Sequence, residues 1–422
     1  MIYVSRKINL KNLTENEKLI LKQLCVSSKD LYNLALERTL CYYSETQKTL
    51  FWQENLKSLK DTPEYKAMGY AFGSVVKEAE ANFKKYLRSV QNENKYRRKW
   101  HEQNNKAINP PDKKKHYFIL LSEIFKQDEK SILIPIPYDM WKKYGELRLT
   151  LTDELRSKKI KRIVISPLYN YREFRMSVSF AIEEIKTDVD MDKAIGIDLG
   201  VDNFATIVSS EGDSFILDGK YLKSTIQGYE KYMAKIKSTK HNQGLKEYTK
   251  KQIHLMNRRH NQVEDYINKC TSYIIKYCLD RKIGNVAVGY NINFSNAPNM
   301  GSANNQMFSQ IPFARFVEKL EFQCKKHNIC FVKLNEMYSS QASFYDNDTI
   351  PDYISSKKHL FSGKRTHRGM YIASDGRKIN ADVNAAANIL RRGNLVSQEK
   401  VLVIQTRGIA QPMRINPLDG NS

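Results

Sequence analysis

Residues 192–207 read DKAIGIDLGVDNFATI, and they place one acid, Asp198, in an apolar run with the length of a buried strand. A buried carboxylate without partners costs several kcal/mol. Either other groups neutralise Asp198, or the stretch is an ordinary turn. The choice depends on whether further acids of the chain gather around this residue.

Composition predicts a soluble protein that binds a polyanion. The chain has 422 residues, of which 41% are hydrophobic and 11% aromatic, so it is globular and has room for about two to four domains. Its formal net charge of +23 favours nucleic acid as the partner, with an anionic membrane surface as the second choice. No stretch is apolar enough to span a membrane, and MIYVSRKINL lacks a signal-peptide core. We therefore expect a cytoplasmic protein of the bacterial cytosol or nucleoid.

The six cysteines predict neither disulfides nor a structural zinc site. None of them forms a CxxC pair, which is the usual spacing of zinc ligands. Cys324 and Cys330 flank His327, which leaves a zinc knuckle as an alternative. Core thiols at the passage from a helix to a strand are the favoured interpretation.

The first half of the chain predicts a small β-barrel interrupted by helices. Residues 2–10 alternate like a strand, and 15–45 and 70–93 have helical spacing. Short strand-like runs follow between 132 and 182 without a long helix between them. The basic stretch after the second helix holds Arg97, Arg98 and Lys99, which either contact phosphates or belong to a solvated connection.

From residue 194 onward the pattern changes to strands alternating with helices. We predict a mixed sheet covered on its faces, followed by a loop-rich section at 336–378, a helix from about 382 and a loosely attached tail at 393–422. The predicted strands are 194–199, 204–208, 214–217, 285–290 and 329–335, and the predicted helices between them are 221–238, 245–281 and 311–327.

Two further acids are candidate partners of Asp198. Asp382 opens the helix predicted in INADVNAAANILRR (379–392), and Glu336 directly follows an apolar strand. Taken alone, Asp382 is an ordinary helix cap and Glu336 an ordinary surface residue. Taken together with Asp198, they form the pattern of an RNase H-like site, in which carboxylates hold two Mg²⁺ ions about 4 Å apart and a phosphodiester is hydrolysed.

These motifs resemble one known family. GIDLGVDNFATI, NNQMFSQIPF (304–313), NEMYSSQASF (335–344) and NADVNAAANIL (380–390) together look like TnpB, the RNA-guided RuvC nuclease of insertion sequences, which resembles the ancestor of type V CRISPR effectors. The resemblance implies an α+β multidomain fold. Its parts would be a wedge-like β-barrel (1–14 and 130–190), a helical recognition insertion (15–129), an RNase H-like (RuvC) nuclease domain (191–335 and 379–392) and a zinc-free target nucleic-acid-binding insert (336–378).

The chain departs from the family pattern at two places. The position that usually holds the middle catalytic glutamate is Gly289, and the usual four-cysteine zinc motif before the last catalytic segment has no cysteine here. The strands at 285–290 and 329–335 should be parallel neighbours about 4.8 Å apart, so Glu336 can reach the place that Gly289 leaves open. We therefore predict that Asp198, Glu336 and Asp382 are the catalytic and Mg²⁺-binding residues. Asp346, Asp348 and Asp375 order loops or serve as substitute ligands, and Asp202 has a supporting role.

The resemblance implies an RNA-guided, Mg²⁺-dependent DNA endonuclease of a transposon. Its partners would be a guide RNA encoded near the transposon end and double-stranded target DNA, with one protein per RNA. Lys364, Arg365 and Arg368 either grip the target strand or form a solvated hairpin. Three alternatives remain: a nuclease-dead RNA-guided repressor, a compact type V CRISPR effector, and a DDE-type transposase or Holliday-junction resolvase. The last does not explain a barrel with a helical insertion ahead of the first aspartate.

Overall fold

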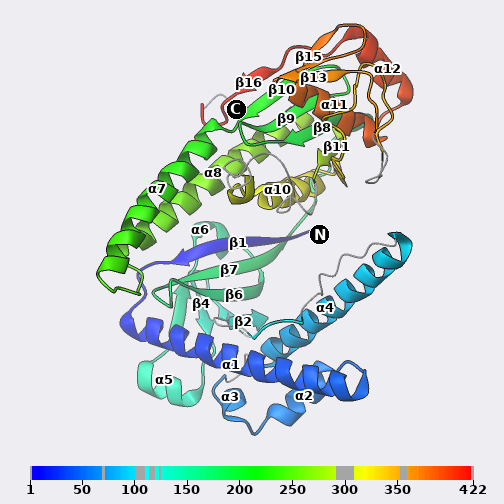
Figure 1. Cartoon of the computed structure of the whole chain (residues 1–422). Helices are drawn as coiled ribbons and strands as arrows, with labels where there is room; N and C mark the ends of the chain where they lie inside the picture. Colours follow the sequence, from blue (N-terminus) through cyan, green and yellow to red (C-terminus); the bar gives the residue numbers. More distant parts are fainter. Residues whose placement is uncertain are drawn as a thin grey trace. The chain divides into compact units, whose positions relative to one another are not determined.

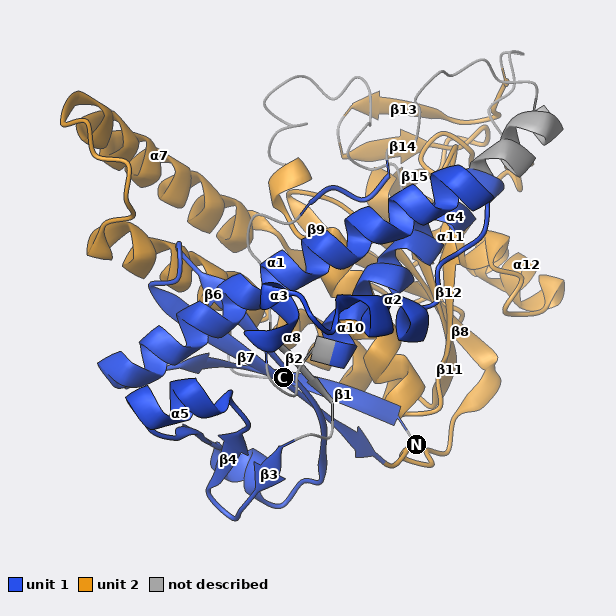
Figure 2. Cartoon of the chain, turned by 90° about the horizontal axis from the view of Figure 1, so that it is seen from below, with its two compact units in different colours: residues 1–182 blue, residues 183–422 orange. Residues whose placement is uncertain are grey.

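The computed structural model describes residues 2–68, 72–100, 110–113, 119–122, 125–290, 308–351, 359–367 and 369–419. The chain forms two compact units, unit 1 at Met1–Ile182 and unit 2 at Glu183–Ser422 (Figure 2). Both mix helices and strands, so the protein has an α+β multidomain fold. No helix in the described ranges is long and apolar enough to cross a membrane.

Unit 1 contains two antiparallel sheets. The larger has the order β1-β7-β6-β2 and the smaller the order β3-β4-β5. Buried residues alternate with less buried ones along β7, as expected for a strand with one face on the core. The predicted β-barrel is not closed among the described residues, because the strands of the two sheets do not pair with each other. The strands are β1 (Ile2–Leu10), β2 (Ile119–Ser122), β3 (Lys126–Gln127), β4 (Ser131–Ile134), β5 (Leu147–Thr150), β6 (Ile160–Leu168) and β7 (Glu173–Ile182).

The helices of unit 1 pack on one another and on the larger sheet (Figure 1). A capping box between Thr14 and Glu17 starts the long helix α1 at the position that the sequence predicts. Arg97, Arg98 and Lys99 fall in the last turns of α4, and their side chains lie outside the described residues. The helices are α1 (Glu15–Thr46), α2 (Trp52–Leu59), α3 (Pro63–Lys66), α4 (Phe72–Trp100), α5 (Tyr138–Tyr144) and α6 (Asp153–Arg156).

Unit 2 is built on a mixed sheet of six strands with the order β12-β11-β8-β9-β10-β16. The strand β11 pairs in parallel with both β8 and β12, which confirms that the strands predicted at 285–290 and 329–335 are parallel neighbours. The carboxyl ends of β8, β11 and β12 therefore meet at one edge of the sheet. The strands are β8 (Asp190–Leu199), β9 (Asn203–Ser209), β10 (Ser214–Asp218), β11 (Ile283–Gly289), β12 (Cys330–Leu334) and β16 (Met413–Ile415).

Helices cover both faces of this sheet. Ile195 and Ile197 of β8 face a core built with α7 (Lys220–Asn242), α8 (Lys250–Asp280) and α10 (Phe313–Lys326). Ala194 of β8 instead packs with α11 (Ala381–Arg392) and α12 (Gln398–Arg407) on the opposite face. Gly196 allows the closest approach, since a Cβ atom there would lie 2.3 Å from the carbonyl oxygen of Ala386 in α11.

The prediction of a loosely attached tail after residue 392 is wrong. In α12, Val401 and Ile404 are buried in the core that α11 forms. The strand β16 then pairs in parallel with β10 and completes the sheet at its edge. Polar residues around these short apolar stretches conceal them in the sequence. Between β12 and α11 the chain also forms a small sheet of β13 (Lys364–His367), β14 (Met370–Ile372) and β15 (Lys378–Asn380).

Candidate active site

Asp198 lies next to the last residue of β8, at the edge where the parallel strands end. Side chains alternate along a strand, so Asp198 points to the same face as Gly196, which is the face that α11 covers. Burial raises the pKa of Asp198 well above its usual range, and the charges of Glu336 and Asp382 raise it further, whereas Arg365 lowers it. Glu336 and Asp382 therefore lie close enough to Asp198 to act on it electrostatically.

Glu336 follows β12 by two residues and reaches the space beside Gly289. The register pairs Gly289 with Leu334, and the backbone N–H of Tyr290 donates to the carbonyl of Leu334 at 2.8 Å. A Cβ atom on Gly289 would lie 3.3 Å from Cβ of Glu336. Burial raises the pKa of Glu336 to about 7. The main chain thus puts this glutamate where a side chain from position 289 would otherwise project.

Asp382 belongs to the first turn of α11, but it is not the helix cap. The side chain of Asn380 caps the helix instead, accepting from the backbone N–H groups of Asp382 and Val383 at 2.9 and 3.2 Å. The carboxylate of Asp382 is therefore available to other partners. It accepts a 2.6 Å hydrogen bond from Asn203 Nδ2, and it lies 3.7 Å from the Arg365 guanidinium.

Asn203 is a site residue that sequence reasoning missed. It opens β9, the strand that pairs antiparallel with β8, and its amide oxygen accepts a 2.8 Å hydrogen bond from Arg414. Arg414 also forms a 3.2 Å ion pair with Asp218. In the sequence, the only indication of a role for Asn203 is that it follows Asp198 closely, in DLGVDN. Asp202 pairs with Lys223 at 2.7 Å.

The three acids of the cysteine-free segment order its loops. Asp346 accepts from the backbone N–H of Ser374 at 3.0 Å, and Asp348 accepts from that of Ser343 at 2.8 Å. Asp375 pairs with Arg377 at 2.6 Å. Of the predicted strand-gripping residues, Lys364 and Arg365 lie exposed on β13, and Arg368 lies outside the described residues.

Among the described residues, no three side chains of His, Cys, Asp or Glu are gathered closely enough to bind one metal ion. All six cysteines are free thiols, and burial raises the pKa of Cys278 to about 12.

Two family models match this chain, and together they include all three acids. Residues 177–294, which include Asp198, match the OrfB_IS605 family, described as a probable transposase. Residues 313–389, which include Glu336 and Asp382, match the Cas12f1-like, TNB domain. The resemblance to TnpB that the motifs predict is thereby confirmed.

Two individual proteins are similar to this chain. The TnpB-like protein ORF457 of Acidianus two-tailed virus is 21% identical over 217 residues, which are 49% of this chain and 44% of that protein. The chain thus matches less than half the length of this relative. The cryo-EM structure of the Cas12f1–sgRNA–target DNA complex is similar with a TM-score of 0.56 and 14% identity, covering 89% of this chain and 83% of that one. At this identity the likeness is one of fold.

Proposed function

We propose that this protein is an RNA-guided, Mg²⁺-dependent DNA endonuclease of a transposon, with an RNase H-like (RuvC) site in unit 2. The observation that carries the proposal is the placement of three acids at the carboxyl ends of the parallel strands: Asp198 in β8, Glu336 beside Gly289, and Asp382 in the first turn of α11. Three carboxylates from β8, the exit of β12 and the first turn of α11 face one small region of the sheet edge. Such a concentration of negative charge is costly unless cations balance it.

The donor set suits Mg²⁺, which prefers carboxylate oxygens. Asp198, Glu336 and Asp382 would hold the ions, and bound Mg²⁺ would supply an activated water and stabilise the leaving oxygen of a phosphodiester. Asn203 keeps the Asp382 carboxylate oriented through its 2.6 Å hydrogen bond. Arg365, on the exposed strand β13, is suited to hold a phosphate of the strand to be cut.

Nucleic-acid partners follow from charge and from the relatives. A net charge of +23 is suited to a long RNA and a DNA duplex. The similar Cas12f1 structure is a complex with sgRNA and target DNA. We infer that this chain binds a guide RNA encoded near the transposon end, that base pairing selects the target, and that the protein reads a short adjacent motif. It would act in the cytoplasm.

Plasmid cleavage tests the proposal. The protein is purified with its flanking RNA and incubated with supercoiled target plasmid in Mg²⁺ or in EDTA. Asp198→Asn and Glu336→Gln keep the shape of the side chains, and both should stop cleavage while RNA and target binding remain. Glu321→Gln is the matched control, because Glu321 is an exposed acid of α10 that pairs with Lys333.

Each outcome is decisive. Loss of cutting in both site variants, with an active control variant, would support the proposed site. Cutting that survives Glu336→Gln would place the third ligand elsewhere. A wild-type protein that binds its target tightly and never cuts would instead be an RNA-guided repressor.

A further inference from the structure

A row of polar side chains interrupts the otherwise apolar helix α11. Asn384 and Asn388 are one turn apart and are only 1% and 0% exposed. Arg391 and Arg392 follow in the next turn, and positions i, i+4 and i+7 share one face of a helix. Buried amides are costly unless they are hydrogen-bonded, so these residues need a specific set of partners.

The main-chain groups that bind Asn384 and Asn388 lie in the segment that follows β12, residues 335–351, called here the post-β12 segment. Asn388 Nδ2 donates to the carbonyls of Ser339 at 2.9 Å and Ala342 at 2.7 Å. Asn384 Nδ2 donates to the same Ala342 carbonyl at 2.8 Å, and its Oδ1 accepts from the N–H of Phe344 at 3.0 Å. Two asparagines therefore bind the irregular main chain at three successive points.

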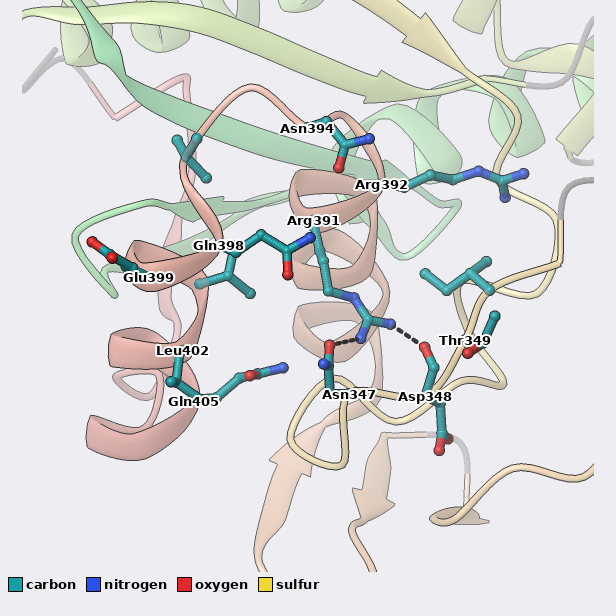
Figure 3. Close-up of a pocket in the computed structure, with 13 residues that line it drawn as sticks. Asn347, Asp348, Thr349, Arg391, Arg392, Asn394, Gln398, Glu399, Leu402 and Gln405 are labelled. Carbon is teal, nitrogen blue, oxygen red and sulfur yellow. Dashed lines mark hydrogen bonds between the residues drawn. The ribbon is translucent and has the colours of Figure 1, made fainter.

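The two arginines bind the post-β12 segment on either side of the points that the asparagines bind. Arg392 donates to the carbonyl of Met337 at 2.9 Å, next to Glu336. Arg391 points toward Asn347 and Asp348, and its Nη2 donates to the Asp348 carbonyl at 2.6 Å (Figure 3). These contacts lie beside a cavity of about 640 Å³ between the segment, the end of α11 and α12.

Ser339 connects Asn388 to Glu336 through hydrogen bonds. Both the N–H and the hydroxyl of Ser339 donate to the carbonyl of Glu336, at 3.0 and 2.7 Å. Asn388 binds the carbonyl of that same serine. Since β12 ends at Leu334, no strand pairing fixes the chain at residue 336. The hydrogen bonds to α11 take over that role.

We propose that Asn388, assisted by Asn384 and Arg392, is a positioning residue that fixes Glu336 relative to Asp382. The inference rests on the proposed function. The reason is that α11 carries both parts. Its first turn holds Asp382, and its later turns bind the post-β12 segment before and after Ser339. The helix itself is held against β8 at Gly196, so Asp198 belongs to the same frame.

Asn388→Ala tests this role, and Asn285→Ala is a closely matched control. Asn285 is 3% exposed and donates two hydrogen bonds to main-chain carbonyls, those of Met191 and Lys193, at the opposite edge of the same sheet. Both variants should melt at similarly lowered temperatures. Only Asn388→Ala should slow single-turnover cleavage, by about 10- to 100-fold, as is typical when a partner of a metal ligand is removed.

Two further readouts separate positioning from stability. Raised Mg²⁺ should restore part of the rate of Asn388→Ala, because a misplaced ligand weakens metal binding. Amide hydrogen exchange of the protein without nucleic acid should show lost protection in residues 336–348 of Asn388→Ala and unchanged protection there in Asn285→Ala.

The outcomes distinguish this inference from the proposed function. Equal cleavage by the two variants, beside an active wild type, would overturn the positioning role and leave the nuclease proposal intact. Unchanged exchange in 336–348 would overturn it as well. If the wild type never cuts, the nuclease proposal fails, and the catalytic part of the inference fails with it.

Discussion

Gly289 and Glu336 lie side by side at the carboxyl edge of the unit 2 sheet, where a Cβ atom on the glycine would be 3.3 Å from Cβ of the glutamate. The two residues belong to neighbouring parallel strands or their exits, and the helix α10 lies between these strands in the chain. The glycine provides the space, and the glutamate provides the carboxylate. A glutamate that follows β12 can therefore lie at the carboxyl end of β11, although β11 itself contains no acid.

Gly289→Ala should lower both stability and cleavage. The new methyl group would lie 2.4 Å from Cδ1 of Ile389, so the side chain of Ile389 has to move. Overpacking of this kind costs about 1–3 kcal/mol of the free energy of unfolding. Urea unfolding measures the loss. Adding Ile389→Val removes the clashing atom and should recover part of it, and strictly additive effects of the two substitutions would contradict the steric explanation.

Gly196→Ala should be far more disruptive than an ordinary glycine substitution. Its Cβ would meet main-chain atoms of α11, the Ala386 oxygen at 2.3 Å and the Leu390 nitrogen at 2.6 Å, and neither can rotate away. We expect a loss of about 3 kcal/mol or more, measured by thermal or urea unfolding. Gly228→Ala is the control. It lies within α7 with nothing inside 4 Å, and it should stabilise the helix by up to about 1 kcal/mol.

Arg365→Ala should weaken binding of target DNA and make it less sensitive to salt. If Arg365 contacts one phosphate, its loss reduces the slope of log K against log salt concentration by about 1. Titrations at several salt concentrations in EDTA measure this without cleavage. Arg365→Lys should keep the slope because it keeps the charge. An unchanged slope in Arg365→Ala would contradict the phosphate contact and leave Arg365 as a charge that balances the site acids, with Asp382 3.7 Å away.

Ile404→Ala should destabilise unit 2 although it lies in the stretch that the sequence presents as a tail. Ile404 is 3% exposed within α12, and truncating such a side chain costs about 2–5 kcal/mol. Leu402 is 62% exposed on the same helix, so Leu402→Ala should change the free energy of unfolding by less than about 0.5 kcal/mol. Equal effects in a denaturant titration would show that α12 is not docked.

Strong local patterns made the central elements of unit 2 predictable. The apolar run around Asp198 favours a strand, and the alanine-rich stretch after Asp382 favours a helix. Alternating strands and helices then favour a sheet with helices on its faces. The strand β16 was not predictable. Three residues carry little pattern, and their pairing with β10 joins segments almost two hundred residues apart. The sequence also did not show that the described strands of unit 1 form two separate sheets, since strand pairing is decided by tertiary contacts.

The acids of the site were easier to find than the residues that support them. A carboxylate in an apolar strand is conspicuous because it is costly, and so Asp198 led to the others. Asn388 looks like a common polar helix residue, and only its bonds to Ser339 and Ala342 distinguish it. Asn203 likewise needed the fold of β9 to bring it to Asp382.

The position of α11 in the chain also has a consequence for protein synthesis. Asp198 precedes Asp382 by 184 residues. At roughly 5–20 residues per second, a ribosome needs about 10–40 s to add the second acid after the first. During that time the nascent chain has neither the helix that braces Glu336 nor the partner of Asn203. A chain that stops before residue 382 therefore lacks one of the three acids and the helix that holds Glu336.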